Sequence, residues 1–485
     1  MKNKILLVLP ATAAYSYLFY MQTPGMNHAV FGLVITVFFA LTDLSLLKNK
    51  TWLAAAASAI ACGILIGVNG TELNFVMHFI SIMVLSYVTI NAKISVLTGI
   101  AYSGISTIGG FMVGVFSKLA NYATTSPAQT PVKEKKFQWY YFLLPLFILI
   151  LFIILYRESS AGFRKLTDLI DLSFISGPWF FFTFSGFVFL YGLFIRPKEL
   201  QFFEEEAGLS NEIEGAPTWK TNGFFKTGLI LFIMLDALLT LVNVSDIIYL
   251  SLYEGQDKGM TYAELIHQGI GALIVSLVLA VTFIMLWFNQ KNTDPQLKRV
   301  LTIAAIAWIV LNLVLIGTNI WKNTLYINAH GLTYKRIGVY FFLFLALLTL
   351  GFCGYKIKTN KNNVFLYRRF GIVIFCLTFI FNCFHWDKIV TRNNIALLKY
   401  KSMTIDGWYL LELSSDCLPL LVENWEAINP AGNPAMDKRL DERCMEFNKN
   451  FESQNWRGLT LNNYKTYEQI KKYKPKTEFV YTESR

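Results

Sequence analysis

The chain has 485 residues, of which 54% are hydrophobic and only 15% are charged. A soluble protein carries about 25% charged residues, so this composition excludes an ordinary soluble domain. The net charge of +11 does not favour nucleic-acid binding, because the Lys and Arg residues are spread through short loops between apolar blocks. We therefore expect an all-α, multi-pass membrane protein with the lipid bilayer as its first partner and no nucleic-acid partner.

Twelve apolar segments have the length of a membrane span, about 20 residues. They are 5–21, 29–47, 52–68, 73–90, 94–116, 137–156, 172–195, 227–250, 262–288, 301–321, 337–355 and 370–386. The first follows Lys2 and Lys4 and contains an Ala-x-Ala sequence at 11–13. Cleavage there would leave too short an apolar core for a signal peptide, so we expect an uncleaved span.

The fifth segment, 94–116, is rich in Gly and Ser, a composition that lets helix backbones approach closely. Its small residues are Gly99, Ser103, Ser106, Gly110 and Gly114. Twelve full spans would place the N-terminal lysines and the C-terminal tail on one face, which conflicts with the charge pattern of the loops. We expect the fifth segment to be re-entrant, which leaves eleven spans. Twelve spans with an external N-terminus remain the alternative.

The polar, proline-containing stretch 121–136 is typical of a linker. It divides an N-terminal helical module, 1–120, from a larger helical bundle, 137–386, which a tail domain, 387–485, follows. Lys and Arg are concentrated on one side of the predicted spans, as in 133–136 and 356–369. That side is expected to be cytoplasmic, which places the tail outside.

The tail has the pattern of a small antiparallel helical domain. Asp406 is placed to cap one helix, and Asp416 with Pro419 is typical of the start of a second. The turn sequence 429–434 precedes a third helix, 435–451, which carries Leu440, Cys444 and Phe447 on one face. Trp456, Arg457, Tyr464 and Tyr467 follow and provide either an aromatic surface for a partner or packing onto the tail itself.

Cys417 and Cys444 lie on neighbouring predicted helices of this tail. Outside the cytoplasm a disulfide between them would persist, so we regard them as a candidate disulfide. Two buried thiols are the alternative. The other four cysteines fall within or at the ends of spans, where apolar packing explains them.

A group of polar residues is predicted to meet at the outer membrane boundary. Asp246 ends one span, while Glu264 and His267 begin the next, three residues apart on one helix face. The last three spans return the chain to this side at Asp387, with Asn393 close behind. We expect a hydrogen-bonded cluster that locks helices together, binds a ligand or handles protons. Whether it holds a metal is unknown, because helical metal sites need more than one Glu-x-x-His pair.

Asp236 lies in the middle of the eighth segment, where a carboxylate is costly unless it is paired or protonated. It is a candidate intramembrane polar residue, either on a transport pathway or in a hydrogen bond to a neighbouring helix.

The sequence has no Gly-rich phosphate loop, Gly-x-Ser-x-Gly, Cys-x-x-Cys or His-Glu-x-x-His motif. No catalytic residue and no cofactor is therefore assigned. Three functions stay open. The favoured one is a non-enzymatic scaffold or accessory subunit that docks an envelope protein through its tail. The others are a transporter or channel component, and a membrane-embedded enzyme that acts on an envelope or lipid-linked substrate.

Several stretches support a family resemblance from Phe163 onward. They are RKLTDLIDLSFIS, NVSDIIYL, YAELIHQG, NAHGLTYKRIGVY, WDKIVTRNNIA and IDGWYLLELSSDCLPLL. In their content and their order, these stretches resemble domain-of-unknown-function family 4173 and its sister family 4153. Both are families of uncharacterised bacterial multi-pass membrane proteins. The resemblance implies a bacterial cell-envelope protein and supplies no activity, cofactor or ligand; we expect the inner membrane as its location. The chain has His330 where the family more often has an aromatic residue.

The tail is predicted to be extracytoplasmic, so alkaline phosphatase fused after Arg485 should be active in cells. Green fluorescent protein at the same position should stay dark, and a fusion in the basic turn at Lys361 should show the opposite pattern. An inactive phosphatase with a fluorescent partner fusion at Arg485 would reverse the assignment.

Overall fold

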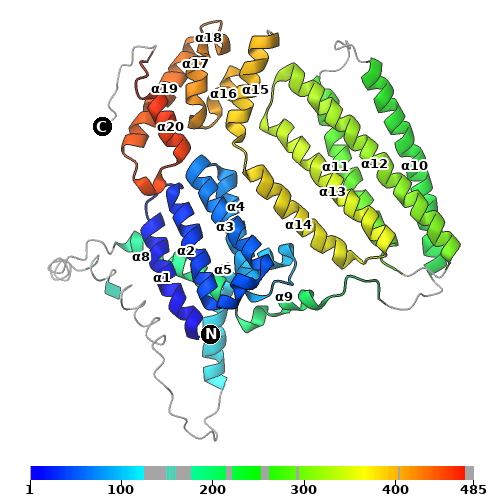
Figure 1. Ribbon diagram of the computed structural model, residues 1–485, viewed down its shortest axis with the longest axis horizontal. Helices are drawn as coiled ribbons and strands as arrows, with labels where there is room; N and C mark the ends of the chain where they lie inside the picture. Colours follow the sequence, from blue (N-terminus) through cyan, green and yellow to red (C-terminus); the bar gives the residue numbers. More distant parts are fainter. Residues whose placement is uncertain are drawn as a thin grey trace, which may run out of the picture.

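The computed structural model describes residues 2–124, 176–214, 221–252, 262–290, 294–401 and 405–475, and a few single residues between 149 and 159. This part of the chain is helical, and its one β-bridge is an isolated pair between Glu212 and Lys361. The predicted all-α, polytopic helical fold is therefore confirmed (Figure 1).

The helices form three groups in chain order. The first is α1 (Lys2–Phe19), α2 (Met26–Thr42), α3 (Lys50–Asn69), α4 (Glu72–Ile90), α5 (Val96–Thr124) and α8 (Gly177–Phe194). The second is α10 (Thr221–Leu252), α11 (Tyr262–Trp287), α12 (Pro295–His330), α13 (Tyr334–Thr359) and α14 (Asn363–Asn382). The tail has α15 (Trp386–Lys401), α16 (Gly407–Glu412), α17 (Leu418–Glu423), α18 (Trp425–Ile428), α19 (Pro434–Glu452) and α20 (Leu461–Ile470).

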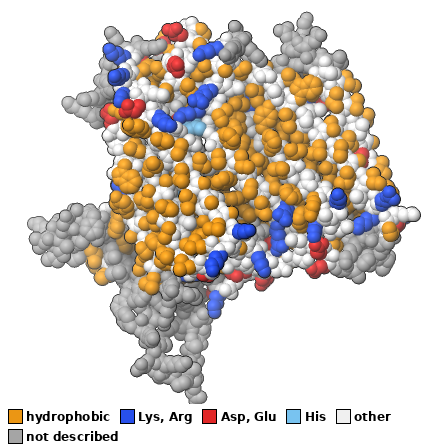
Figure 2. All heavy atoms as spheres, viewed as in Figure 1, with side chains coloured by type: hydrophobic (Ala, Val, Ile, Leu, Met, Phe, Trp, Pro, Cys, Tyr) orange, Lys and Arg blue, Asp and Glu red, His pale blue; other side chains and the backbone are white. Residues whose placement is uncertain are grey.

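Eight of the described helices are long and apolar enough to cross a membrane. They are α3, α4, α5, α8, α10, α12, α13 and α14. Three further apolar stretches, Lys4–Phe19, Met26–Thr42 and Ile274–Trp287, are shorter. Figure 2 shows the resulting surface, a broad hydrophobic band with charged side chains gathered toward its edges. The predicted span 137–156 lies outside the described residues, apart from a few single positions.

The fifth segment forms one continuous helix, α5, and its part Val96–Gly114 is long and apolar enough to cross a membrane. Its small residues serve helix packing: a Cβ on Gly99 would clash with the Tyr87 ring on α4. A Cβ on Gly192 of α8 would likewise clash with the backbone of α5 at Ser106. Close packing, and not a break in the helix, explains this composition.

The two ends of the first group face opposite sides of the molecule. Lys4, at the start of α1, lies within electrostatic reach of Asp43 and Arg196, which follow α2 and α8. The opposite ends of α1, α2 and α3 contact the tail. Lys4 and the tail therefore lie at opposite ends of the bundle.

Each group has its own core. In the first, Trp52, Phe31 and Leu85 are buried, and α10 to α14 enclose a second cluster around Phe232 and Trp308. The third cluster joins tail residues to Leu332 and Ile337 of the α12–α13 region. The tail is therefore continuous with the second group.

The predicted tail helices are confirmed. Asp406 caps α16 by accepting a hydrogen bond from the backbone N–H of Tyr409. The segment η5 (Ser415–Cys417) leads into α17, and Leu440, Cys444 and Phe447 are buried on α19. Local capping and helical periodicity were sufficient to predict these elements.

The tail closes over the ends of the first group. Near η6 (Trp456–Gly458), the carbonyl of Leu459 accepts a hydrogen bond from the N–H of Met26 over 3.0 Å. Arg457 donates to the carbonyl of Tyr17 at the end of α1 and lies over its ring. Between α3 and α20, Asn462 donates to Asn69 over 3.0 Å. These contacts hold the tail against the α1–α2 turn and the α3–α4 turn of the first group.

Two further connections join the first and second groups. Asn74 of α4 donates to the carbonyl and side-chain oxygens of Asn382 on α14 over 2.9 and 2.8 Å. At the opposite end, η3 (Lys198–Leu200), α9 (Phe202–Glu205) and η4 (Glu206–Gly208) run between the groups. Glu206 accepts hydrogen bonds from Ser95 N–H and from Arg368, both over 2.8 Å.

The contact between the tail and the α1–α2 turn can be tested with glycine variants. A Cβ on Gly25 would collide with the backbone of Gly458, whereas one on Gly104 would meet nothing within 4 Å. Gly25→Ala is therefore expected to lower the free energy of unfolding by about 1–3 kcal/mol, and Gly104→Ala should be neutral or slightly stabilising. The unfolding midpoint in detergent measures both. Equal midpoints would mean that the tail does not rest on this turn.

Candidate functional site

The densest group of buried polar residues lies where the α12–α13 turn, α15 and the α16–η5 segment meet. Asp387, in the first turn of α15, is only 8% exposed. Its Oδ1 accepts a hydrogen bond from the Tyr334 hydroxyl over 2.6 Å, and its Oδ2 accepts one from the backbone N–H of Ser414 over 3.2 Å. The carboxyl group therefore joins a transmembrane helix to two segments of the tail. We call this region the tail junction.

Asn394, two turns further along α15, holds the end of α12. Its Oδ1 accepts a hydrogen bond from the N–H of Leu332 over 2.6 Å, and its Nδ2 donates to the Leu332 carbonyl over 3.0 Å. The neighbouring Gly331 has φ = +79°, and a Cβ there would clash with the Asn394 amide. Glycine is required at this position because the left-handed backbone and the close approach both exclude a side chain.

Arg336 closes the same turn from α13. Its Nη1 donates to the carbonyls of His330 and Gly331, and its guanidinium lies 3.9 Å from the centre of the Tyr326 ring. Asn323 donates in turn to the Arg336 carbonyl over 3.0 Å. The positive guanidinium of Arg336 thus pairs with the partly negative carbonyl groups at the end of α12, which is a favourable electrostatic interaction.

His385 and Asp416 form a second pair at the tail junction. His385 Nε2 lies 2.7 Å from Asp416 Oδ2, and both side chains are largely buried. The other ring nitrogen, Nδ1, accepts from the backbone N–H of Lys388 over 3.4 Å, as a capping residue does at a helix start. This histidine therefore links the first turn of α15 to η5. Burial lowers the pKa of the neighbouring Lys388 amine.

The two tail cysteines are buried and are free thiols in the structure. Burial raises the pKa of Cys417 to about 11 and that of Cys444 to about 12. Both values disfavour the reactive thiolate at neutral pH. The disulfide that the sequence made a candidate is not present here.

The predicted four-residue cluster is divided between different partners. Asp246 pairs with Lys322 of α12 over 2.8 Å, whereas Asp387 binds Tyr334 and Ser414. Glu264 and His267 fall on α11, but their side chains lie outside the described part of the structure. Figure 1 shows α10 at one edge of the second group, well away from α15.

The two remaining predicted polar residues keep an unpaired oxygen. Asn393 is half-buried at the tail junction, and its Oδ1 has no hydrogen-bond partner among the described residues. Asp236 is half-buried in the middle of α10, and its Oδ1 is equally unpaired within the described chain.

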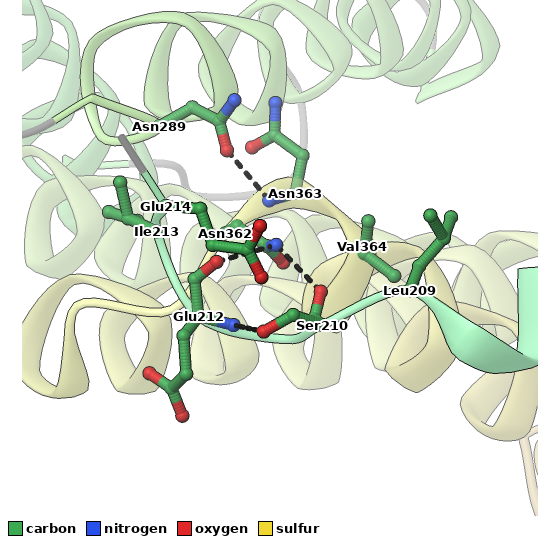
Figure 3. Close-up of a pocket in the computed structure, with 9 residues that line it drawn as sticks. All are labelled: Leu209, Ser210, Glu212, Ile213, Glu214, Asn289, Asn362, Asn363 and Val364. Atoms are coloured by element: carbon green, nitrogen blue, oxygen red, sulfur yellow. Dashed lines mark hydrogen bonds between the residues drawn. The ribbon is translucent and has the colours of Figure 1, made fainter. Parts of the chain in front are cut away.

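A shallow pocket of about 250 Å³ lies at the opposite end of the molecule (Figure 3). Most of the polar groups that line it are hydrogen-bonded to one another. Asn362 Nδ2 donates to the carbonyls of Ser210 and Glu212, and Asn289 Oδ1 accepts from the N–H of Asn363. These groups are already paired with one another. The pocket therefore marks the place where the segment after η4 is hydrogen-bonded to the α13–α14 turn.

Sequence reasoning missed most of the tail junction. Tyr334, Arg336, His385 and Ser414 were not singled out, although three of them lie within the family-like stretches quoted above. Those stretches contained the available signal: NAHGLTYKRIGVY, WDKIVTRNNIA and IDGWYLLELSSDCLPLL supply the residues that meet here.

Replacing Asp387 by Ala should lower the free energy of unfolding by about 2–4 kcal/mol, because the Tyr334 hydroxyl and the Ser414 N–H lose a charged acceptor. Tyr334→Phe removes only one of these bonds and should cost less. A double-mutant cycle measures the coupling, which should be at least about 0.5 kcal/mol for direct contact. Additive effects would contradict the contact.

Thiol alkylation tests the state of the cysteines. Cys417 and Cys444 should stay unmodified in the native protein at neutral pH, since burial and raised pKa values keep them protonated. Both should react after denaturation without reductant, and the exposed Cys383 serves as the native-state control. Alkylation should accelerate as the pH rises toward the two pKa values. Recovery of the pair as a disulfide would establish the alternative.

Comparison with known proteins gives a family but no characterised relative. The family model described as a domain of unknown function, DUF4153, matches residues 69–424, from the α3–α4 turn to the end of α17. No curated protein and no solved structure matches the chain. The match is to the sister family of the resemblance, and it begins well before Phe163. Since it covers most of the chain, including the whole of α4 to α16, the protein belongs to the DUF4153 family.

Proposed function

We propose that the protein is a non-enzymatic scaffold or accessory subunit of the bacterial envelope, in which the tail domain docks a protein partner. The observation that supports this proposal is the tail junction. Asp387 and Asn394 each use both polar atoms of their side chains in hydrogen bonds to the protein's own backbone and side chains. Residues that are paired in this way hold segments in place and are not free to bind a substrate.

The tail also rests on the first helix group, so it contacts both transmembrane groups. Arg457 and Gln454 reach Tyr17 and Thr23 at the end of α1. A domain held at several points presents its outer face in one orientation, which reduces the entropy lost on binding. This arrangement suits a docking platform.

The aromatic residues of the tail divide into two sets. Tyr467 stacks on Phe451 with ring centres 4.4 Å apart, so it belongs to the tail's own packing. Trp456 is 50% exposed and Tyr464 is 53% exposed. Trp and Tyr are enriched at protein interfaces because they bury a large area at a small entropic cost. We assign the docking surface to Trp456 and Tyr464.

A transporter component is the second candidate. The half-buried Asp236 of α10, with an unpaired carboxylate oxygen among the described atoms, favours it.

Photo-crosslinking in cells tests the docking surface. A photoreactive amino acid at Trp456 or Tyr464 should yield a discrete protein adduct, and one at the exposed Phe202, at the other end of the molecule, should not yield that adduct. Trp456→Ala should abolish the adduct formed from position 464 without changing the unfolding midpoint, whereas Tyr467→Ala should lower the midpoint. Adducts with lipid alone would mean that these rings anchor the tail to the bilayer, and the docking proposal would fall.

A further inference from the structure

Three cations of the tail gather beside the tail junction. Lys388 and Arg392 are four residues apart on α15, so they lie on one side of that helix. Lys465 belongs to α20, and both α15 and α20 pack against η5. Lys388 lies within electrostatic reach of Arg392 and of Lys465. Figure 2 shows Lys and Arg side chains gathered above the hydrophobic band, over the region where α15 and α20 lie in Figure 1.

The acids of the same two elements, η5 and α20, are already engaged. Asp416 of η5 is within reach of Lys388, but its Oδ2 lies 2.7 Å from His385 and its Oδ1 is buried. Glu468 of α20 pairs with Lys471 over 2.6 Å. Among the described residues, none of the three cations forms an ion pair. The area therefore carries an excess of positive charge.

This arrangement is unfavourable unless an anion is bound. Burial lowers the pKa of the Lys388 amine, and the charges of Arg392 and Lys465 lower it further, whereas Asp416 raises it. Lys388 also lies in the first turn of α15, where the helix dipole adds a partial positive charge. Like charges in a partly dry site repel one another, and an anion between them removes the repulsion.

The position of the cations relative to the membrane favours one class of anion. The span α14 ends at Asn382, and α15 begins at Trp386. Beside this break, Ile380 and Phe384 expose apolar side chains. Phospholipid phosphates lie at this depth, at the edge of the hydrocarbon, and Lys and Arg bind them through charge-assisted hydrogen bonds. A phospholipid would use both the charges and the apolar surface next to them.

We propose that Lys388, Arg392 and Lys465 form a phosphate-binding site at the membrane boundary, which holds the headgroup of an anionic phospholipid. The planar Arg392 guanidinium is suited to donate two parallel hydrogen bonds to a phosphate, and the two ammonium groups add charge. A bound lipid would tie α15 to α20 across η5 and so fix the tail on the membrane. The inference does not rest on the docking role of Trp456 and Tyr464.

The test measures the unfolding midpoint of the full-length protein in neutral detergent micelles. Added phosphatidylglycerol should raise the midpoint by several degrees, because a ligand that binds only the folded state stabilises it. Phosphatidylcholine, which has no net charge, should not raise it. Inorganic phosphate at matched ionic strength separates the two sources of a phosphate group. An equal rise with inorganic phosphate would support the site but overturn the lipid as its ligand.

Lys388→Met, Arg392→Met and Lys465→Met each remove one charge while keeping a long side chain, and each should remove most of the response to phosphatidylglycerol. Lys449→Met is the matched control, because Lys449 is an exposed lysine of α19 that does not act on Lys388. It should keep the full response. Without anionic lipid, Lys388→Met should leave the midpoint unchanged or raise it, since it relieves repulsion. A lower midpoint would mean that Lys388 stabilises the tail through Asp416, against the proposal.

Two further outcomes would overturn the site. A wild-type midpoint that responds to neither phosphatidylglycerol nor phosphate would leave the three cations to an acidic protein segment. A response that survives in all three variants, or that Lys449→Met loses equally, would show that the lipid binds elsewhere on the protein.

Discussion

Inside a bilayer there is no water to satisfy a polar group, and the described structure depends on this constraint. Asn74 and Asn382 illustrate it, because Asn74 donates two hydrogen bonds to Asn382 and thereby joins the first helix group to the second. Asn323 joins α12 to α13 in the same way through the Arg336 carbonyl. Each such side chain becomes a specific link between helices, since leaving it unpaired would cost several kcal/mol, about 2–7 by transfer measurements. Apolar packing brings the helices together, and these bonds select which faces meet.

The same constraint explains why the tail is part of the bundle. Helix ends carry carbonyl groups without partners, and at the end of α12 these are satisfied by Arg336 and Asn394. Asp387 then connects α13 to the segment before η5. The junction is therefore a structural joint built from the polar residues of three family-like stretches, which supports a scaffold more than a catalyst. Asp236 and Asn312 are the contrast, because their oxygens are buried and unpaired within the described residues.

Two members of the predicted polar cluster, Asp246 and Asp387, have different partners in the structure. Counting spans placed Asp246 and Asp387 toward one end of the second helix group, because parity depends only on the number of crossings. The number of crossings carries no information about the lateral position of a helix. Asp246 pairs with Lys322, whereas Asp387 binds Tyr334 and Ser414. The Gly- and Ser-rich fifth segment shows a similar limit, because small residues serve close packing as readily as a break in a helix.

The sequence by itself determined the environment and the local elements. Hydrophobic blocks, charges in loops and caps such as Asp406 depend on neighbours in the chain, so membrane class, most spans and the tail helices were predictable. Only the tertiary structure decided which helices are neighbours, that the tail covers the ends of the first group, and that Tyr334, Arg336 and Asn394 meet at one junction. The physical reason is that a helical span can rotate and shift sideways without changing its hydropathy, and only packing between helices distinguishes those arrangements.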